Sequence, residues 1–489
     1  MKDLRNLAIK GAIWNYSINF VSAFIQPLTI LIVARFLSPE HFGIFGMSIL
    51  VIRFVIYIQD IGTGYALIQR KQFSETNTNT AFLNIAALGI LWFFLIFFIA
   101  PFIANYFKNY DLILAIRVLA IYFLLNPLSF IQRKIFEREL KFKNLFFLRA
   151  LSLIFSAVVA ISLVIMKFDF WALIFGFLAE PFILAIVIWK FSSWRPRLLY
   201  DLKLSKRMFS FGGLATAALL LGWLINFVDH VFVGRFLGER QLGIYQLGGR
   251  LGLFLFFYAA APLCRVFYST FCKIQEDKLS LKNYYLGYIR LVSTLVIPVC
   301  ALIYFIAPLA IKLFLEFRWH PTIRIIQLFS IFSIFLSFVA VNPELLRAVG
   351  RQKVLLKILV ARIVFTVPLL YFFAQRSIIE VCYVHIVVSA IFLPINLLIL
   401  HKILRWKVYE LLNVLKSSIV IILALVFTNT LFQRQIFGLN FMHDNNLLKL
   451  FTLSTFLVIT YFILLIRLEK QYFRELLVFL KDIFSNANR

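Results

Sequence analysis

The sequence predicts an all-α integral membrane protein of about fourteen transmembrane helices, arranged as two six-helix pseudo-symmetric lobes plus two C-terminal helices. Hydrophobic residues make up 62% of the 489 residues and only 15% are charged, whereas a soluble domain is nearer half apolar and a quarter charged. Apolar runs long enough to cross a bilayer, about 20 residues each, recur along the whole chain. Together with a mean hydropathy of +0.91, these runs exclude a soluble enzyme.

The apolar runs, taken in order between polar or charged breaks, give the expected spans. The first run follows Lys2, Arg5 and Lys10 and is too long for a cleaved signal peptide, so we expect a retained signal-anchor helix. The expected spans are 12–34, 42–66, 78–104, 112–131, 144–166 and 169–189, then 208–233, 242–264, 285–311, 322–346, 354–375 and 378–400, and finally 416–433 and 447–466.

The distribution of positive charge predicts the orientation of these spans. With the N-terminus in the cytoplasm, and with Arg324, Lys357, Lys416 and Lys449 at the span ends counted in the adjoining loops, cytoplasmic segments hold 33 of the 50 Lys and Arg, outward loops hold 11 and spans hold six. Cytoplasmic loops of membrane proteins are enriched in Lys and Arg, and an even number of spans places both termini in the cytoplasm. The formal net charge of +28 therefore faces membrane lipids, whose headgroups are partly anionic, and we expect no nucleic-acid partner.

An internal repeat relates the two lobes. Residues 33–45 read VARFLSPEHFGIF and residues 233–245 read VGRFLGERQLGIY, with six of thirteen positions identical at an offset of 200. Asn126-Pro127 and Asn342-Pro343 are a further echo. Because each block has an even number of helices, the repeats are parallel, as in transporters built from two lobes. The predicted domains are 1–200 (spans 1–6), 201–407 (spans 7–12) and 408–489, which holds two extra spans and a cytoplasmic interfacial tail.

Sequence motifs for catalysis and for metal or cofactor binding are absent. There is no Walker loop, HExxH or GxSxG. The four cysteines have no CxxC or Cys/His ligand spacing. We expect neither an enzyme nor a cofactor-dependent protein, and no metal site. The four cysteines are Cys264, Cys272, Cys300 and Cys382.

Two motifs resemble a known family. ARFLSPEHFGIFGM with DIGTGYALIQRKQFSETNTNTAF (Asp60 to Phe82), and DHVFVGRFLGERQLGIYQLGGRL (Asp229 to Leu251), are similar to the signatures of Wzx/WzxC-type flippases. These belong to the multidrug/oligosaccharidyl-lipid/polysaccharide exporter superfamily. The resemblance implies a two-lobed fold in the bacterial inner membrane. It also implies translocation of undecaprenyl-pyrophosphate-linked oligosaccharide repeat units to the periplasmic leaflet, for O-antigen, capsule or exopolysaccharide biosynthesis. A polysaccharide polymerase and a chain-length regulator would be its partners.

Two other function classes stay open. One is an ion-coupled exporter of drugs or small molecules from the same superfamily. The drug-exporting relatives carry an acidic residue in the first helix, where this chain has Asn15, Asn19, Gln26 and Thr29 but no carboxylate. The other class is a membrane glycan polymerase or ligase, which typically has a large periplasmic loop, whereas every expected outward loop here is short.

Basic residues inside the spans are candidates for binding the substrate, because ionisable groups are costly there unless they have a function. Arginine suits phosphate because its planar fork donates two hydrogen bonds. Arg53 and Arg250 lie deepest and at nearly repeat-equivalent positions, so we expect them to face each other across a cationic cavity. Arg149 and Arg290 lie near the inner ends of their spans, where snorkelling to headgroups is the favoured reading. The six candidates are Arg53, Arg250, Arg117, Arg362, Arg149 and Arg290.

Acidic residues in or beside the spans are candidates for coupling transport to an ion. Asp229 with His230 would form an ion-coupling site or a pH-sensitive pair; a buried ion pair with an arginine is the alternative reading. The coupling candidates are Asp229, Glu180, His230 and Asp60, and Glu344 is a further acidic residue. The stretch QRKIFERELKFK (residues 132–143) is expected to be a cytoplasmic amphipathic loop that receives substrate.

Overall fold

The computed structural model describes residues 2–59, 74–436 and 446–470. These residues form helices and contain no strand, which confirms the all-α fold class. Contacts divide the chain into two units, Met1–Gly243 and Ile244–Arg489. Elements of the first unit are α1 (Lys2–Phe36), α2 (Pro39–Ile58), α4 (Glu75–Phe107), α5 (Asp111–Leu119), α6 (Tyr122–Arg138), α7 (Phe142–Ile165), α8 (Trp171–Phe191) and most of α9 (Leu202–Gly252).

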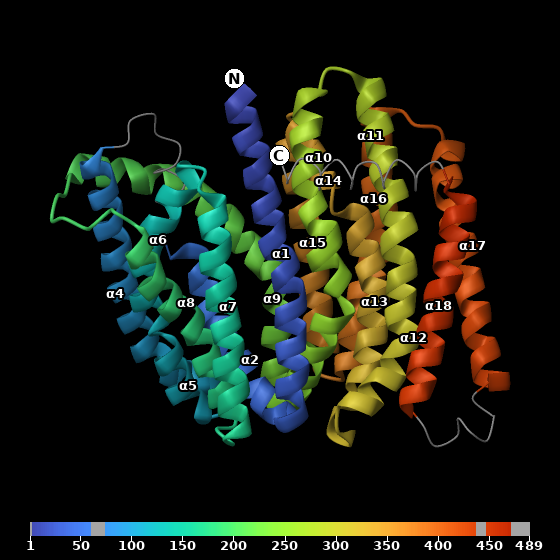
Figure 1. Ribbon diagram of the computed structural model, residues 1–489, viewed down its shortest axis with the longest axis horizontal. Helices are drawn as coiled ribbons and strands as arrows, with labels where there is room; N and C mark the ends of the chain where they lie inside the picture. The colour runs from blue at the N-terminus through green and yellow to red at the C-terminus, as the bar shows by residue number, and fades with distance from the viewer. Residues whose placement is uncertain (1, 60–73, 437–445, 471–489) are drawn as a thin grey trace. The chain divides into compact units, whose positions relative to one another are not determined.

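The second unit follows the end of α9. Its elements are η1 (Phe256–Ala260), α10 (Ala261–Lys273), α11 (Lys278–Leu291), η2 (Val292–Val296), α12 (Ile297–Phe314), η3 (Phe317–Trp319), α13 (Thr322–Val339), α14 (Asn342–Ala348), α15 (Gln352–Phe373), α16 (Ile378–Leu404), α17 (Val408–Leu431), η4 (Phe432–Ile436) and α18 (Asn446–Leu468). Figure 1 shows α7 beside α8 in the first unit, and α18 beside α17 in the second.

Eleven helical segments of the described chain are long and apolar enough to cross a membrane. A twelfth is counted if Gly222–Gly252 and Phe256–Lys273, bent by 52°, form one span. The apolar part of α1, Phe20–Phe36, is shorter than these segments. The protein is therefore a multi-span membrane protein, and the number fourteen stays a prediction.

Helix starts follow local sequence signals. Ser38 caps α2, where its Oγ accepts a hydrogen bond from the backbone N–H of His41, and Pro39 occupies the first turn. Ser74 caps α4 in the same way. Inside α9, Gly238 has φ +80, a left-handed conformation that glycine adopts without strain, and it separates the helix into two parts. Both copies of the repeated motif thus contain a helix start, at Pro39 and after Gly238.

The linker from α8 to α9 is fastened to α4. Asn79 Oδ1 accepts a hydrogen bond from the backbone of Arg197 at 2.7 Å, and Thr80 Oγ1 accepts one from Asp201 at 3.1 Å. Asn84 Oδ1 accepts hydrogen bonds from the hydroxyls of Tyr200 and Ser205. The first turns of α9 then pack with α4 and α6 in one buried apolar cluster. These contacts attach the start of α9 to the first unit, which extends to Gly243, and the predicted division after residue 200 stays a prediction.

The repeated Asn-Pro pairs occupy buried positions in both units. Asn126 is 3% exposed and Asn342 is 1% exposed. Asn342 Oδ1 accepts a hydrogen bond from the Tyr285 hydroxyl at 3.2 Å, and the Tyr285 ring stacks on Trp406. Buried amides are costly unless they are hydrogen-bonded, so both asparagines serve as polar anchor points in apolar bundles.

One expectation about helix boundaries was wrong. Residues 132–138, expected to belong to a cytoplasmic loop, continue α6 as far as Arg138. Within this stretch α6 buries Gln132, Ile135 and Phe136, and this packing overrides the run of charges. The C-terminal interfacial tail falls largely on residues 471–489, outside the described residues.

Candidate functional site

Arg250 lies near the end of α9, and its side chain is exposed. The Tyr258 hydroxyl of η1 lies within its electrostatic reach. Within residues 2–59, 74–436 and 446–470, the Arg250 guanidinium has neither a hydrogen bond nor an ion pair. A guanidinium on a membrane helix is expensive without compensation. Its exposure therefore makes it available to an anionic ligand.

Three of the predicted residues, Arg53, Asp229 and His230, lie around Phe227, and we call these four residues the α2–α9 cluster. The Arg53 guanidinium carbon lies 5.7 Å from the Phe227 ring centroid, within the range of a cation–π contact. The His230 ring lies 5.8 Å from the same Phe227 ring. His230 Nδ1 is 2.8 Å from Asp229 Oδ1, and Asp229 is only 4% exposed. The cluster thus joins a fixed cation and a titratable acid–imidazole pair through one aromatic ring.

A second polar group, the α6 network, was missed by the sequence analysis. Asn126 Nδ2 donates to Gln59 Oε1 at 3.0 Å, and Arg133 Nη2 donates to Asn126 Oδ1 at 2.7 Å. The Glu180 carboxylate interacts electrostatically with Arg133 and Arg149. Arg133 was assigned to the expected loop. The signal that could have identified it is its position seven residues, or two helical turns, after the buried Asn126.

Arg149 and Arg117 are engaged within the first unit. Arg149 Nη2 lies 3.9 Å from a Glu137 oxygen, and both side chains are partly exposed. Arg117 Nε donates to the Phe97 carbonyl at 3.2 Å, and its guanidinium lies 4.4 Å from the Phe97 ring centroid. These contacts favour a packing role for Arg117 between α4 and α5.

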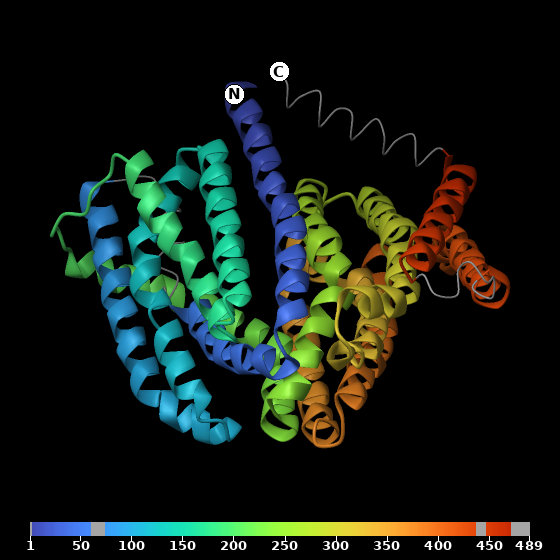
Figure 2. The ribbon, with the colours of Figure 1, turned by 60° about the horizontal axis from the view of Figure 1, so that its bottom comes forward.

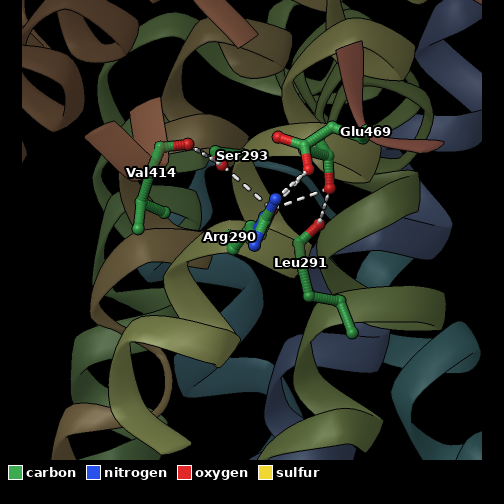
Figure 3. Close-up of polar contacts among 6 residues, drawn as sticks. Arg290, Leu291, Ser293, Val414 and Glu469 are labelled. Carbon is green, nitrogen blue, oxygen red and sulfur yellow. Dashed lines mark hydrogen bonds and ion pairs between the residues drawn. The ribbon is translucent and has the colours of Figure 1, made fainter. Parts of the chain in front are cut away.

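Arg290 has a carboxylate partner that the snorkelling interpretation did not include. Its guanidinium forms an ion pair with Glu469, and Nε donates to Glu469 Oε2 at 2.9 Å (Figure 3). Glu469 is 3% exposed. One turn after Arg290, the Thr294 carbonyl of η2 accepts a hydrogen bond from the Tyr461 hydroxyl of α18 at 3.1 Å. Arg290 therefore joins α11 to the end of α18, and α17 and α18 pack beside α12 (Figure 1, Figure 2).

The remaining predicted residues are placed as follows. Arg362 of α15 is half-buried, and its Nη2 donates to Ser389 Oγ of α16 at 3.4 Å. Glu344 pairs with Arg347 one turn further along α14 at 2.9 Å. Asp60 lies outside the described residues. In the described chain, no group of three or more His, Cys, Asp or Glu side chains is arranged to hold a metal ion.

Comparisons with known proteins place these residues in a wider context. Residues 32–324 match the family described as "Polysaccharide biosynthesis protein". The chain is 25% identical over 305 residues to the teichuronic acid biosynthesis protein TuaB of Bacillus subtilis, covering 61% of this chain and 62% of that protein. It is 23% identical over 382 residues to the lipopolysaccharide biosynthesis protein WzxC of Escherichia coli, covering 77% of each.

Solved structures share the fold. The lipid II flippase MurJ in an inward closed conformation superposes with a TM-score of 0.74 and 14% identity, covering 96% of this chain and 99% of that one. An inward-facing transporter of the multidrug MATE family gives a TM-score of 0.56 and 14% identity, covering 82% of this chain and 99% of that one. Both similarities support a multi-span, all-α transporter fold.

Proposed function

Because this chain belongs to the polysaccharide biosynthesis protein family, we propose that it is a flippase for lipid-linked oligosaccharides. Its substrate would be an oligosaccharide repeat unit on undecaprenyl pyrophosphate, moved from the cytoplasmic to the periplasmic leaflet of the bacterial inner membrane. The names of the relatives TuaB and WzxC and the fold shared with MurJ support this proposal. A polysaccharide polymerase and a chain-length regulator would act on the product.

The observation that carries the proposal is the accessible guanidinium of Arg250 on a membrane helix, which has no hydrogen bond or ion pair among the described residues. A pyrophosphate crossing the hydrocarbon core loses its hydration, and a fixed cation replaces part of that hydration through charge-assisted hydrogen bonds. Arg53 supplies a second fixed cation in the α2–α9 cluster, and Arg133 and Arg362 are further half-buried candidates. That Arg53 faces Arg250, which lies in the other unit, stays a prediction.

A reconstituted assay tests the function directly. Purified protein in liposomes is expected to move a fluorescent undecaprenyl-pyrophosphate oligosaccharide between leaflets. The same preparation should neither export cationic drugs nor lengthen the glycan. Drug efflux or glycan polymerisation without translocation would contradict the proposal in favour of one of the other two classes.

We propose that both termini are cytoplasmic and that the start of the second part of α9 is periplasmic. Arg240 is exposed there, with a side-chain exposure of 58%, and Lys203 is exposed in the first turn of α9. With the outer membrane permeabilised, an impermeant thiol reagent is expected to label Arg240→Cys in intact cells and to spare Lys203→Cys. The reverse labelling pattern would overturn this topology.

We propose that Asp229, paired with His230, couples transport to an ion gradient. The Glu180 carboxylate lies within electrostatic reach of two guanidinium groups, those of Arg133 and Arg149, whereas Asp229 lies against the imidazole of His230. Asp229→Asn is therefore expected to abolish the dependence of transport on the proton or sodium gradient, and Glu180→Gln to retain it. The measurement is translocation in liposomes with an imposed gradient of each ion in turn. If the Asp229→Asn/Glu180→Gln double variant keeps the same dependence on the ion gradient, neither carboxylate couples transport to that ion.

A further inference from the structure

The membrane span that contains α11 and α12 has a weak point where η2, a π-helix, joins the two helices. Pro298 in the first turn of α12 has no N–H, so the hydrogen bond that an α-helix would make to the Thr294 carbonyl, four residues earlier, cannot form. The Ser293 and Thr294 hydroxyls both donate to the Arg290 carbonyl, at 2.9 and 2.7 Å, and such bonds bend helices. Prolines and π-bulges are also recognised causes of bending. We call η2 together with Pro298 the α11–α12 hinge.

The last described helix, α18, supplies polar partners to this hinge. The Tyr461 hydroxyl donates to the Thr294 carbonyl at 3.1 Å, so it provides a donor where Pro298 lacks one. Tyr461 is 5% exposed, and in such a buried place a carbonyl without a hydrogen bond is costly. One turn before Thr294, Arg290 pairs with Glu469, which directly follows α18 (Figure 3). The end of α18 is thus attached to the hinge at two points, about two helical turns apart.

We propose that α18 is a brace that sets the bend of the α11–α12 hinge. Before the hinge, Glu469 attaches the end of α18 to Arg290 of α11. After the hinge, Leu302 of α12 lies in one buried apolar cluster with Leu453 and Leu457 of α18. A helix that is attached on both sides of a weak point limits the angle between the two parts, because hinge motion is absorbed by only a few residues. The brace acts within the second unit and is independent of the substrate that the protein transports.

Hydrogen exchange of backbone amides in the purified full-length protein tests the brace. Tyr461→Phe removes the hydroxyl and keeps the ring that packs in the apolar cluster with α12. The amides of Val292–Val296 are expected to exchange about two- to tenfold faster in this variant, the factor that the loss of one hydrogen bond produces. The amides of α13, which also packs on α12, should exchange at the native rate. Equally faster exchange throughout the second unit would show general destabilisation and would overturn the proposal.

Two further variants make this measurement specific to the hinge. The matched control is Tyr409→Phe, which removes the hydroxyl of an exposed tyrosine of α17 and should leave exchange at the hinge unchanged. Pro298→Ala restores an N–H four residues after Thr294, so the Thr294 carbonyl no longer needs the Tyr461 hydroxyl. In the Pro298→Ala background, Tyr461→Phe is therefore expected to change the exchange rate by less than about twofold. Equal acceleration with and without Pro298 would show that the hydroxyl does not replace the missing donor, and would contradict the proposal.

Spin labels measure the bend itself. They are attached at Tyr284→Cys of α11 and Phe314→Cys of α12, both exposed positions, in a variant whose native cysteines are replaced and whose unfolding temperature is unchanged. A narrow distribution of distances between the labels is expected with the native brace, and a broader one after Tyr461→Phe with Glu469→Gln. The same distribution in both proteins would show that α18 does not set the bend. Because neither measurement uses transport, failure of the brace and failure of the proposed function are distinguished.

Discussion

Replacing Arg250 with alanine is expected to remove most surface polysaccharide while the protein still reaches the membrane. Within the described chain its guanidinium has no hydrogen bond or ion pair to lose, so the substitution should not disturb folding. A charge-assisted contact to pyrophosphate is worth about 1.5–3 kcal/mol, so its loss should weaken substrate affinity by about ten- to a hundredfold. Arg250→Lys should recover only part, because an ammonium keeps the charge but lacks the planar fork.

The matched control for this prediction is Arg351→Ala. Arg351 is an exposed arginine of the same unit, at the start of α15 and outside the apolar helix. Surface polysaccharide, protein level in the membrane and affinity for purified lipid-linked oligosaccharide are measured for each variant. Normal export by well-expressed Arg250→Ala protein would contradict the role of Arg250. Arg53→Ala is also expected to reduce surface polysaccharide. Poor expression of the Arg53→Ala variant alone would instead assign Arg53 a role in folding, through its contacts in the α2–α9 cluster.

Much of the fold could be predicted because a bilayer demands long apolar helices. The runs at 144–166 and 378–400 correspond closely to α7 and α16. The repeat offset of 200 also identified the equivalent segments around Gly43 and Gly243. Sequence identity shows that two segments are equivalent, however, and cannot show that they touch. That Gly43 packs against the backbone of Glu239, and Gly243 against the backbone of Pro39, became visible only when their positions in space were known.

The candidate site could be predicted only in part, for a related reason. Burial cost identifies ionisable residues in apolar runs, and in this way Arg53, Asp229 and Arg250 were selected. Their partners are distant in sequence, so the contact of Arg53 with Phe227 could not be anticipated. Arg133 was missed because a run of charges at a helix end has the same composition as a loop, although α6 continues through it.

Arg290 shows most clearly how an unseen partner changes an interpretation. Its position near the end of a span suggested snorkelling, yet it pairs with Glu469, 179 residues away. Glu469 is 3% exposed, whereas the Arg290 side chain is 42% exposed. Removing the arginine would therefore leave a buried carboxylate without this partner, while removing the carboxylate would leave an arginine that water can reach. The two single substitutions should have unequal effects on stability.

Arg290→Ala is accordingly expected to lower the free energy of unfolding by about 3 kcal/mol, the lower end of the cost of breaking a buried ion pair from one side. Glu469→Gln should cost less, and Arg290→Ala with Glu469→Gln should be more stable than Arg290→Ala alone, because the uncompensated charge is gone. Thermal unfolding of purified protein in detergent measures all three. The matched control is Lys282→Ala, which breaks the ion pair at 2.8 Å between α11 and Glu410 of α17. Glu410 is 21% exposed, so water can compensate its charge and the loss should be smaller. Arg290→Ala and Lys282→Ala could instead destabilise the protein equally, with no recovery in the Arg290→Ala/Glu469→Gln variant. That result would show that the buried Glu469 carboxylate does not depend on Arg290, and that apolar packing against α12 alone holds α17 and α18 in place.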